Sequence, residues 1–198
     1  DQVEVKHFQG WMEWAKEHDL KLDFNSTSFS HPKSGNLSLA NPDKSIRDFW
    51  IEHTKRCRRI ADAMGKFQND PCIMNIWVHD GSKDLTVERL RYRQILKDSL
   101  DDILTENLPN MKTCLEAKLF GIGLEAYTVG SHDFYTAYCA KNNVIYTLDT
   151  GHYEPTEDVS NMISALLLFV PELMLHVSRP MHWDSDHVTL FDDNTRNL

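Results

Sequence analysis

The chain has 198 residues, enough for one substantial domain with its own hydrophobic core. Its composition, 41% hydrophobic and 26% charged residues, is ordinary for a globular protein. The net charge of -9 argues against nucleic acid or an anionic membrane as the main partner.

Residues 5–20, near the start of the chain, have the pattern of an amphipathic helix that is already in progress. Asp1 is not a methionine, and the strand-like run 187–192 is followed by only a short segment that ends at Leu198. We therefore expect the chain to be a piece of a longer protein.

The cysteines and the hydropathy indicate the compartment. Four widely spaced cysteines without a CxxC pair are typical of a reducing compartment. No apolar run approaches the roughly 20 residues that a membrane helix needs. We expect a cytoplasmic protein.

Six short runs rich in Ile, Val, Leu and Tyr are predicted strands. Several are too apolar to be half-solvated, which is typical of parallel strands that are covered on both faces. The runs span residues 20–25, 72–78, 113–120, 143–149, 172–178 and 187–192.

Helical patterns separate these strands and have candidate N-caps at Ser45, Thr86, Ser131 and Thr156. The alternation of strand and helix predicts a parallel sheet covered by helices, either doubly wound or closed into a barrel. No GxGxxG or Walker-type loop follows any strand, which disfavours the doubly wound sheet.

Polar residues at the carboxyl ends of the predicted strands favour the barrel. A ring of functional groups from the ends of many strands is how barrel enzymes build their sites. These residues are Asn25, His31, Trp77, Asp80, Glu116, Lys118, Asp149, His152 and His176. A full barrel takes about 250 residues, so we expect α/β architecture as a partial (β/α)8 TIM barrel of about six βα units. Residues 1–198 would form a single domain from its central part.

The pair Glu116-x-Lys118 places two charged side chains on one face of a strand. Either they form a surface ion pair, or they point together into a site. Apolar neighbours on both sides weaken the first interpretation, and a metal ion on Glu116 would supply the partner that a buried charge needs.

Asp149 and His152 lie three residues apart across a turn that contains Gly151. An aspartate at this position commonly caps the next helix, but Thr156 is already a candidate for that cap. Gly151 permits a sharp turn that would bring both side chains to the barrel mouth.

The segment 175–187 combines His176 at a strand end with Asp184 and Asp186. Two carboxylates on one side of an extended segment repel each other unless a cation lies between them. Together with imidazole they suit Mn, Zn, Co or Mg, and the number of ligands fits two ions better than one. A solvated surface loop is the alternative.

Several aromatic side chains near the strand ends have a size and position suited to a sugar cavity. Phe29, Trp77 and Trp183 are candidates for its lining, although core packing explains such residues equally well. For Trp14 and Trp50 we expect core positions.

Five long motifs, which follow one another through nearly the whole chain, resemble the L-rhamnose isomerase family, with the xylose isomerases as looser relatives. The motifs are "LDFNSTSFSHP", "MNIWVHDGSKD", "LEAKLFGIGLEAYTVGS", "LDTGHYEPTE" and "LHVSRPMHWDSDHV".

This resemblance implies a (β/α)8 barrel, a cytoplasmic homotetramer and two divalent ions, Mn or Zn. Six residues match metal ligands of the family: Glu116, Asp149 and His176 for a first, structural ion, and His152, Asp184 and Asp186 for a second, catalytic ion. Lys118 resembles the catalytic lysine beside the carbonyl end of the sugar, and His31 and Trp77 resemble sugar contacts. A fourth ligand of the first ion, an aspartate, would follow Leu198.

The activity that the resemblance implies is the interconversion of L-rhamnose and L-rhamnulose, with catalytic roles for Lys118 and Asp184. The sequence leaves open whether hydrogen moves as a hydride or as a proton through an enediol. Alternative functions are a divalent-metal barrel hydrolase, such as an endonuclease, and a non-catalytic scaffold fragment. The charge of -9 disfavours the endonuclease. We expect this piece alone to have little activity.

Overall fold

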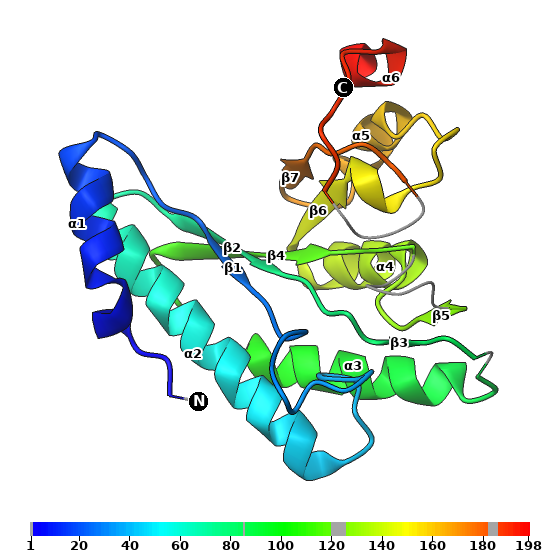
Figure 1. The fold of residues 1–198 in the computed structure, drawn as a ribbon, viewed down its shortest axis with the longest axis horizontal. Coiled ribbons are helices and arrows are strands. Elements are labelled where there is room, and N and C mark those ends of the chain that lie inside the picture. The colour runs from blue at the N-terminus through cyan, green and yellow to red at the C-terminus, as the bar shows by residue number, and fades with distance from the viewer. Residues whose placement is uncertain (1, 85, 120–125, 182–185) are drawn as a thin grey trace.

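A five-stranded parallel sheet forms the centre of the computed structural model, which describes residues 2–84, 86–119, 126–181 and 186–198 (Figure 1). Its strands are β1 (Phe24–Ser26), β2 (Cys72–Ile76), β4 (Met111–Glu116), β6 (Ile145–Asp149) and β7 (Leu173–His176). Two shorter strands, β3 (Gly81–Ser82) and β5 (Tyr127–Thr128), form a separate antiparallel ribbon.

Helices connect the strands of the main sheet. They are α2 (Lys44–Gln68), α3 (Arg89–Ile103), α4 (His132–Asn142) and α5 (Ser160–Leu166). The 3-10 turn η1 (Val5–Phe8) and α1 (Gln9–Glu17) precede the sheet, η2 (Thr150–His152) follows β6, and α6 (Asp193–Asn197) ends the chain. No helix in the part of the chain that the structure describes is long and apolar enough to span a membrane.

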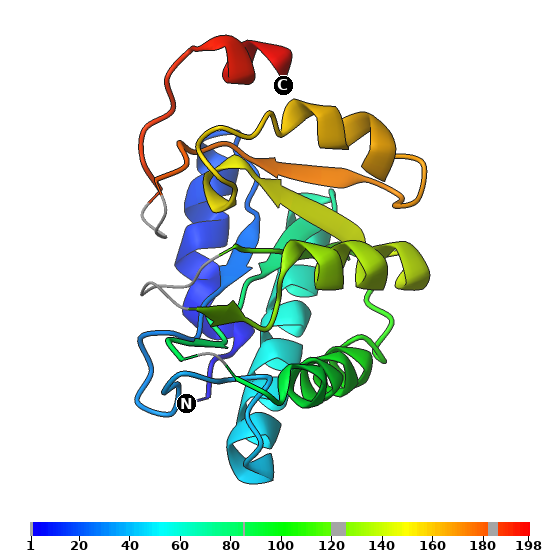
Figure 2. The same cartoon turned by 90° about the vertical axis from the view of Figure 1, so that its right-hand side faces the viewer.

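The order of the strands distinguishes the two α/β architectures. The five strands are hydrogen-bonded in the order in which they occur along the chain, β1-β2-β4-β6-β7, and all pairs are parallel. A doubly wound sheet reverses its order at a switch point, whereas a (β/α)8 barrel adds each strand beside the previous one. Figure 2 shows β6 and β7 side by side at one margin of this curved sheet. The fold is a partial (β/α)8 barrel, as predicted.

The sixth predicted strand, 187–192, is wrong. In this segment the structure shows one isolated bridge, between Arg179 and His187, and then an irregular path into α6. Val188 and Phe191 are largely exposed. A β-pattern becomes a strand only where a neighbouring strand accepts its hydrogen bonds, so the apolar alternation alone was insufficient. The first strand also begins later than predicted, at Phe24.

Two of the predicted helix starts involve Ser45 and Ser131. Ser131 is the N-cap of α4, where its hydroxyl accepts a hydrogen bond from the Phe134 amide. The cap of α2 is Asp43 instead of Ser45, because the Asp43 carboxylate accepts hydrogen bonds from both the amide and the hydroxyl of Ser45.

The other two candidate caps were wrong. The helix α3 begins at Arg89, so its N-cap position is Glu88, two residues after Thr86. The Thr86 hydroxyl accepts a hydrogen bond from the Glu88 amide, ahead of the helix. The helix α5 begins only at Ser160, so Thr156 lies in the preceding loop.

The hydrophobic core lies between the sheet and the helices and is dominated by β-strand and α2 residues. Among its most buried members are Trp50, Ile60, Met74, Leu96, Leu115, Tyr135 and Leu148. Trp50 is therefore a core residue, as predicted. Trp14 is not, since 44% of it is exposed on α1.

Candidate metal centre

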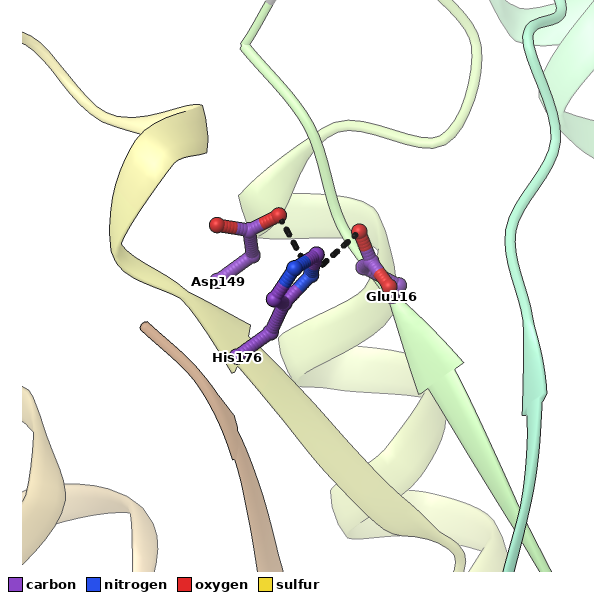
Figure 3. A group of neighbouring side chains, drawn as sticks. All are labelled: Glu116, Asp149 and His176. Atoms are coloured by element: carbon purple, nitrogen blue, oxygen red, sulfur yellow. Dashed lines mark ion pairs between the residues drawn. The ribbon is translucent and has the colours of Figure 1, made fainter. Parts of the chain in front are cut away.

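Three strands of the sheet end in side chains that point toward one another. Glu116 is the last residue of β4, Asp149 the last of β6, and His176 the last of β7 (Figure 3). Asp149 and His176 are also partners in the register of β6 and β7. Because the strands are parallel and adjacent, their carboxyl ends lie at one edge, which brings together residues that are far apart in the sequence.

The three side chains are close enough to bind one ion. His176 Nδ1 lies 3.0 Å from Asp149 Oδ2 and 3.8 Å from Glu116 Oε1. One donor atom from each residue falls within 4.8 Å of the others. Glu116 and Asp149 are buried, and His176 is partly exposed. Two carboxylates and an imidazole are a donor set typical of Mn or Zn, so the residues fit a divalent ion.

Electrostatics at this cluster favour positive charge. Burial, reinforced by the neighbouring Asp149, raises the pKa of Glu116. Burial opposes ionisation of Asp149 too, but His176, His152 and the Gly151 amide together outweigh it and lower the pKa of that carboxyl. The neighbouring carboxylates of Asp149 and then Glu116 raise the pKa of His176 to about 11. A bound divalent cation would compensate the charge of the two carboxylates in place of a protonated His176, whose imidazole would then be a neutral ligand.

Asp149 serves both of the roles considered for it. Its Oδ1 accepts hydrogen bonds from the Gly151 amide at 2.7 Å and the Ser178 hydroxyl at 3.1 Å, so it caps the turn η2. Its Oδ2 faces His176. A side chain at Gly151 would meet Ser178 Oγ at 2.0 Å, which explains why this turn requires glycine.

His152 joins the same cluster from η2. Its Nδ1 lies 3.1 Å from the carbonyl oxygen of Ala117, 3.3 Å from Asp149 Oδ2 and 3.4 Å from Glu116 Oε1. A carbonyl oxygen can only accept, so Nδ1 carries a proton, and in the neutral ring the lone pair lies on Nε2. Nε2 is then the nitrogen with which His152 would bind a metal ion.

The second predicted set of ligands is only partly described. Asp186 is exposed, and its Oδ1 lies 3.5 Å from His176 Nε2. Asp184, like Trp183, lies outside the described residues. His152 adjoins Glu116 and Asp149, as noted above. A second site formed by His152, Asp184 and Asp186 therefore stays a prediction.

Asn75, in the middle of β2, is a residue of this region that we did not predict. Its amide nitrogen donates a hydrogen bond to Glu116 Oε2, and its amide oxygen accepts one from the Thr147 hydroxyl at 2.9 Å. The signal was available, since an asparagine inside the otherwise apolar run "CIMNIWV" needs buried partners.

Lys118 lies just beyond the end of β4 and is almost completely buried. Its Nζ is 4.4 Å from the centre of the Trp77 ring, a cation–π distance. Phe29 stands edge-on to the same ring, at 5.6 Å between centroids.

A cavity of about 310 Å³ opens at this end of the sheet. Its described lining consists of Asn25, Thr27, Phe29, Trp77, Glu116, His176 and Asp186. The structure thus brings the predicted sugar contact Trp77 to the metal cluster. It places His31 elsewhere, against the rings of Phe49 and Trp50 of α2, so a role of His31 in sugar binding stays a prediction.

The fold and these residues define a class: partial (β/α)8 barrels with a carboxylate–imidazole cluster at the carboxyl ends of their strands. Residues 1–198 match the family described as L-rhamnose isomerase (RhaA), and the chain belongs to this family.

Curated relatives named L-rhamnose isomerase include those of Bacteroides thetaiotaomicron, 68% identical over 198 residues, and Pectobacterium carotovorum, 50% identical over 201 residues. The relative of Rhodopirellula baltica is 49% identical over 201 residues. Each alignment covers 100% of this chain but only 47–48% of the relative, so the chain spans about half the length of these proteins.

Two solved structures share the fold at low sequence identity. A D-tagatose 3-epimerase-like protein superimposes with a TM-score of 0.63 at 15% identity, covering 94% of this chain and 67% of the other. D-psicose 3-epimerase from Clostridium cellulolyticum H10 gives 0.53 at 12% identity, covering 87% and 58%. These similarities support the barrel architecture alone.

Proposed function

We propose that the whole protein to which this chain belongs is a metal-dependent aldose–ketose isomerase that interconverts L-rhamnose and L-rhamnulose. The observation that carries the proposal is the meeting of Glu116, Asp149 and His176 at one edge of the sheet in a member of the L-rhamnose isomerase family. The lining of the adjacent cavity by Phe29 and Trp77 supports a sugar-sized ligand.

The proposed ligands of the first divalent ion are Glu116, Asp149 and His176, and those of the second are His152, Asp184 and Asp186. We propose Mn for both, with Zn, Co or Mg as alternatives. When bound, divalent ions supply Lewis acidity that polarises the oxygens of an open-chain sugar. Asn75 and the η2 amide of Gly151 hold the Glu116 and Asp149 carboxylates in their orientations.

Lys118 and Trp77 are proposed to act on the sugar directly. The Lys118 ammonium, buried beside the Trp77 ring, can stabilise negative charge that develops on an oxygen at the carbonyl end of the substrate. Phe29 and Trp77 present ring surface to the cavity, which suits the apolar faces of a sugar and excludes water. Asp184 is proposed as a further catalytic residue.

A cytoplasmic homotetramer is the proposed setting of the whole protein. The four cysteines are buried free thiols, and burial raises the pKa of each to about 12, so none is poised to react. Such thiols are compatible with a reducing compartment.

The test is turnover of L-rhamnose by the full-length protein. A chelator should abolish the appearance of L-rhamnulose, and added Mn²⁺ should restore it. Glu116→Gln should lower turnover about 100-fold or more, because a ligand carboxylate is lost. The matched control is Glu172→Gln, since Glu172 forms an exposed ion pair with Lys112. Turnover that survives both the chelator and Glu116→Gln would refute the proposal.

A further inference from the structure

Residues 27–40 form a loop between β1 and α2 (Figure 1), and this loop contacts the residues that follow β2. The loop contributes Thr27 and Phe29 to the cavity lining. It contains neither helix nor strand, and the backbone hydrogen bonds inside it, such as the one from the Ser34 amide to the His31 carbonyl, close single turns. Such turns shape the loop but do not by themselves place it against Trp77. Something outside the loop has to place Phe29 against Trp77.

His79 contacts this loop on both sides of Phe29. Its Nδ1 lies 3.2 Å from Ser28 Oγ, and its Nε2 lies 3.1 Å from the carbonyl oxygen of Gly35. Because the carbonyl only accepts, Nε2 carries the proton, and the Ser28 hydroxyl donates to Nδ1. The buried ring therefore bridges two points of the loop, one of them adjacent to Phe29.

Asp80 holds the next part of the same loop. Its Oδ1 accepts hydrogen bonds from the amide of Ser38 at 2.8 Å and from its hydroxyl at 2.6 Å, and its Oδ2 accepts one from the Ala40 amide at 2.6 Å. The carboxylate is fully buried, and a buried carboxylate is tolerated only when such donors surround it. The Asp80 backbone carbonyl also accepts a hydrogen bond from the Val129 amide, which ties it to the neighbouring strand connection.

Neither residue is among the described residues that line the cavity, but His79 and Asp80 lie only two and three positions after Trp77, in the segment that leaves β2. We infer that His79 and Asp80 are positioning residues for sugar binding, which act by holding the 27–40 loop so that Phe29 stands against Trp77. The inference rests on the proposed isomerase function. The ligand that these residues would help to bind is a sugar, open-chain or cyclic, that packs on the rings of Phe29 and Trp77 in the wall of the cavity.

This role has a kinetic signature that separates it from a structural one. The metal cluster is built on β4, β6 and β7, whereas the described residues of the loop that reach the cavity, Thr27 and Phe29, line its wall. Releasing the loop should weaken binding of the sugar and leave metal affinity and the chemical step nearly unchanged. KM should rise while kcat is retained.

The experiment uses the full-length protein, with L-rhamnose as substrate and Mn²⁺ as the metal. Asp80→Asn replaces an acceptor by an amide NH2 that faces the Ser38 or Ala40 donors, and His79→Ala removes the bridge. Each should raise KM about tenfold, with kcat and the Mn²⁺ dissociation constant close to the wild type. His79→Gln, whose amide can still donate toward Gly35, should fall between wild type and His79→Ala. The matched control is Asp70→Asn, because Asp70 is in an exposed ion pair with Lys21.

Phe29→Ala provides a second route that does not depend on the stability of the loop variants. Phe29 is 47% exposed, so its removal should leave the fold intact and reproduce the rise in KM. An unchanged KM in Phe29→Ala, or a parallel loss of metal affinity and kcat in the folded loop variants, would overturn the inference. A wild-type protein that does not convert L-rhamnose would refute the proposed function, and this inference with it. A wild-type protein that is active while its variants keep normal KM refutes the inference alone.

Discussion

At the scale of single residues, the metal cluster depends on a side chain that is not itself a predicted ligand. Asn75 uses both ends of its amide, donating to Glu116 and accepting from Thr147. It is 4% exposed, so water cannot replace either partner. The amide therefore fixes which oxygen of Glu116 turns toward Asp149 and His176 and which turns away. Outer partners of this kind commonly set the affinity of a metal site.

Replacing Asn75 by alanine in the full-length protein should lower its affinity for Mn²⁺ about 10–100-fold, because Glu116 loses the donor that orients it. Calorimetric titration of the metal-stripped protein measures this directly. Asn142→Ala is the matched control, since Asn142 is an exposed residue whose amide bonds only within its own helix. An Asn75→Ala protein that is folded and binds Mn²⁺ as tightly as the wild type would show that Glu116 needs no such support.

At the scale of elements, the packing of α2 against the residue before β4 fixes where β4 begins in the sheet. It thereby fixes the position of Glu116 at the other end of that strand. In the last turn of α2, Gly65 lies against the carbonyl oxygen of Asn110, one residue before β4 begins. That carbonyl accepts a hydrogen bond from the Cys72 amide at 3.1 Å. Asp62 of the same helix accepts a hydrogen bond from the Asn110 amide at 2.8 Å. The backbone amide and the backbone carbonyl of Asn110 are thus both held, and the helix can approach this residue only where a side chain is absent.

Gly65→Ala should therefore destabilise the protein by roughly 1–3 kcal/mol, despite the better helix propensity of alanine. The added Cβ would lie 1.7 Å from Asn110 O, and the backbone there cannot move without breaking the bond to Cys72. Gly10→Ala in α1 is the control, with nothing within 4 Å of its Cβ, and should stabilise by up to about 1 kcal/mol. Denaturant unfolding of both variants gives the comparison. Equal effects of the same sign would contradict the packing argument.

The elements also show how far sequence reasoning reached. Strands such as 72–78 and 143–149 were predictable because buried parallel strands are continuous apolar runs, and their observed cores are Cys72–Ile76 and Ile145–Asp149. The run 187–192 has a similar pattern, but among the described residues it forms only the bridge between Arg179 and His187, and sequence patterns do not show pairing partners. The cap of α2 was misplaced by two residues because Asp43 and Ser45 are both good caps, and only the geometry of the turn selects Asp43.

At the scale of the whole molecule, the architecture explains why the cluster Glu116, Asp149 and His176 was predictable. In a sheet whose strands follow one another in chain order, residues at successive carboxyl ends must be neighbours in space. No comparable topological rule predicts the position of a loop residue such as His31. That position depends on the contacts of the whole 27–40 segment with α2 and β2. For the same reason His79 was not singled out, although it holds that segment.

The central claim, that the carboxyl ends of β4, β6 and β7 bind a divalent ion, is tested most directly by titrating Mn²⁺ into the metal-stripped full-length protein. Wild type should bind tightly, and His176→Gln should bind at least about 100-fold more weakly, because an imidazole ligand between two carboxylates is lost. His18→Gln should bind like wild type, since His18 is an exposed residue that contacts only α1. A wild-type protein without a tight Mn²⁺ site, or a folded His176→Gln protein with undiminished affinity, would contradict the claim.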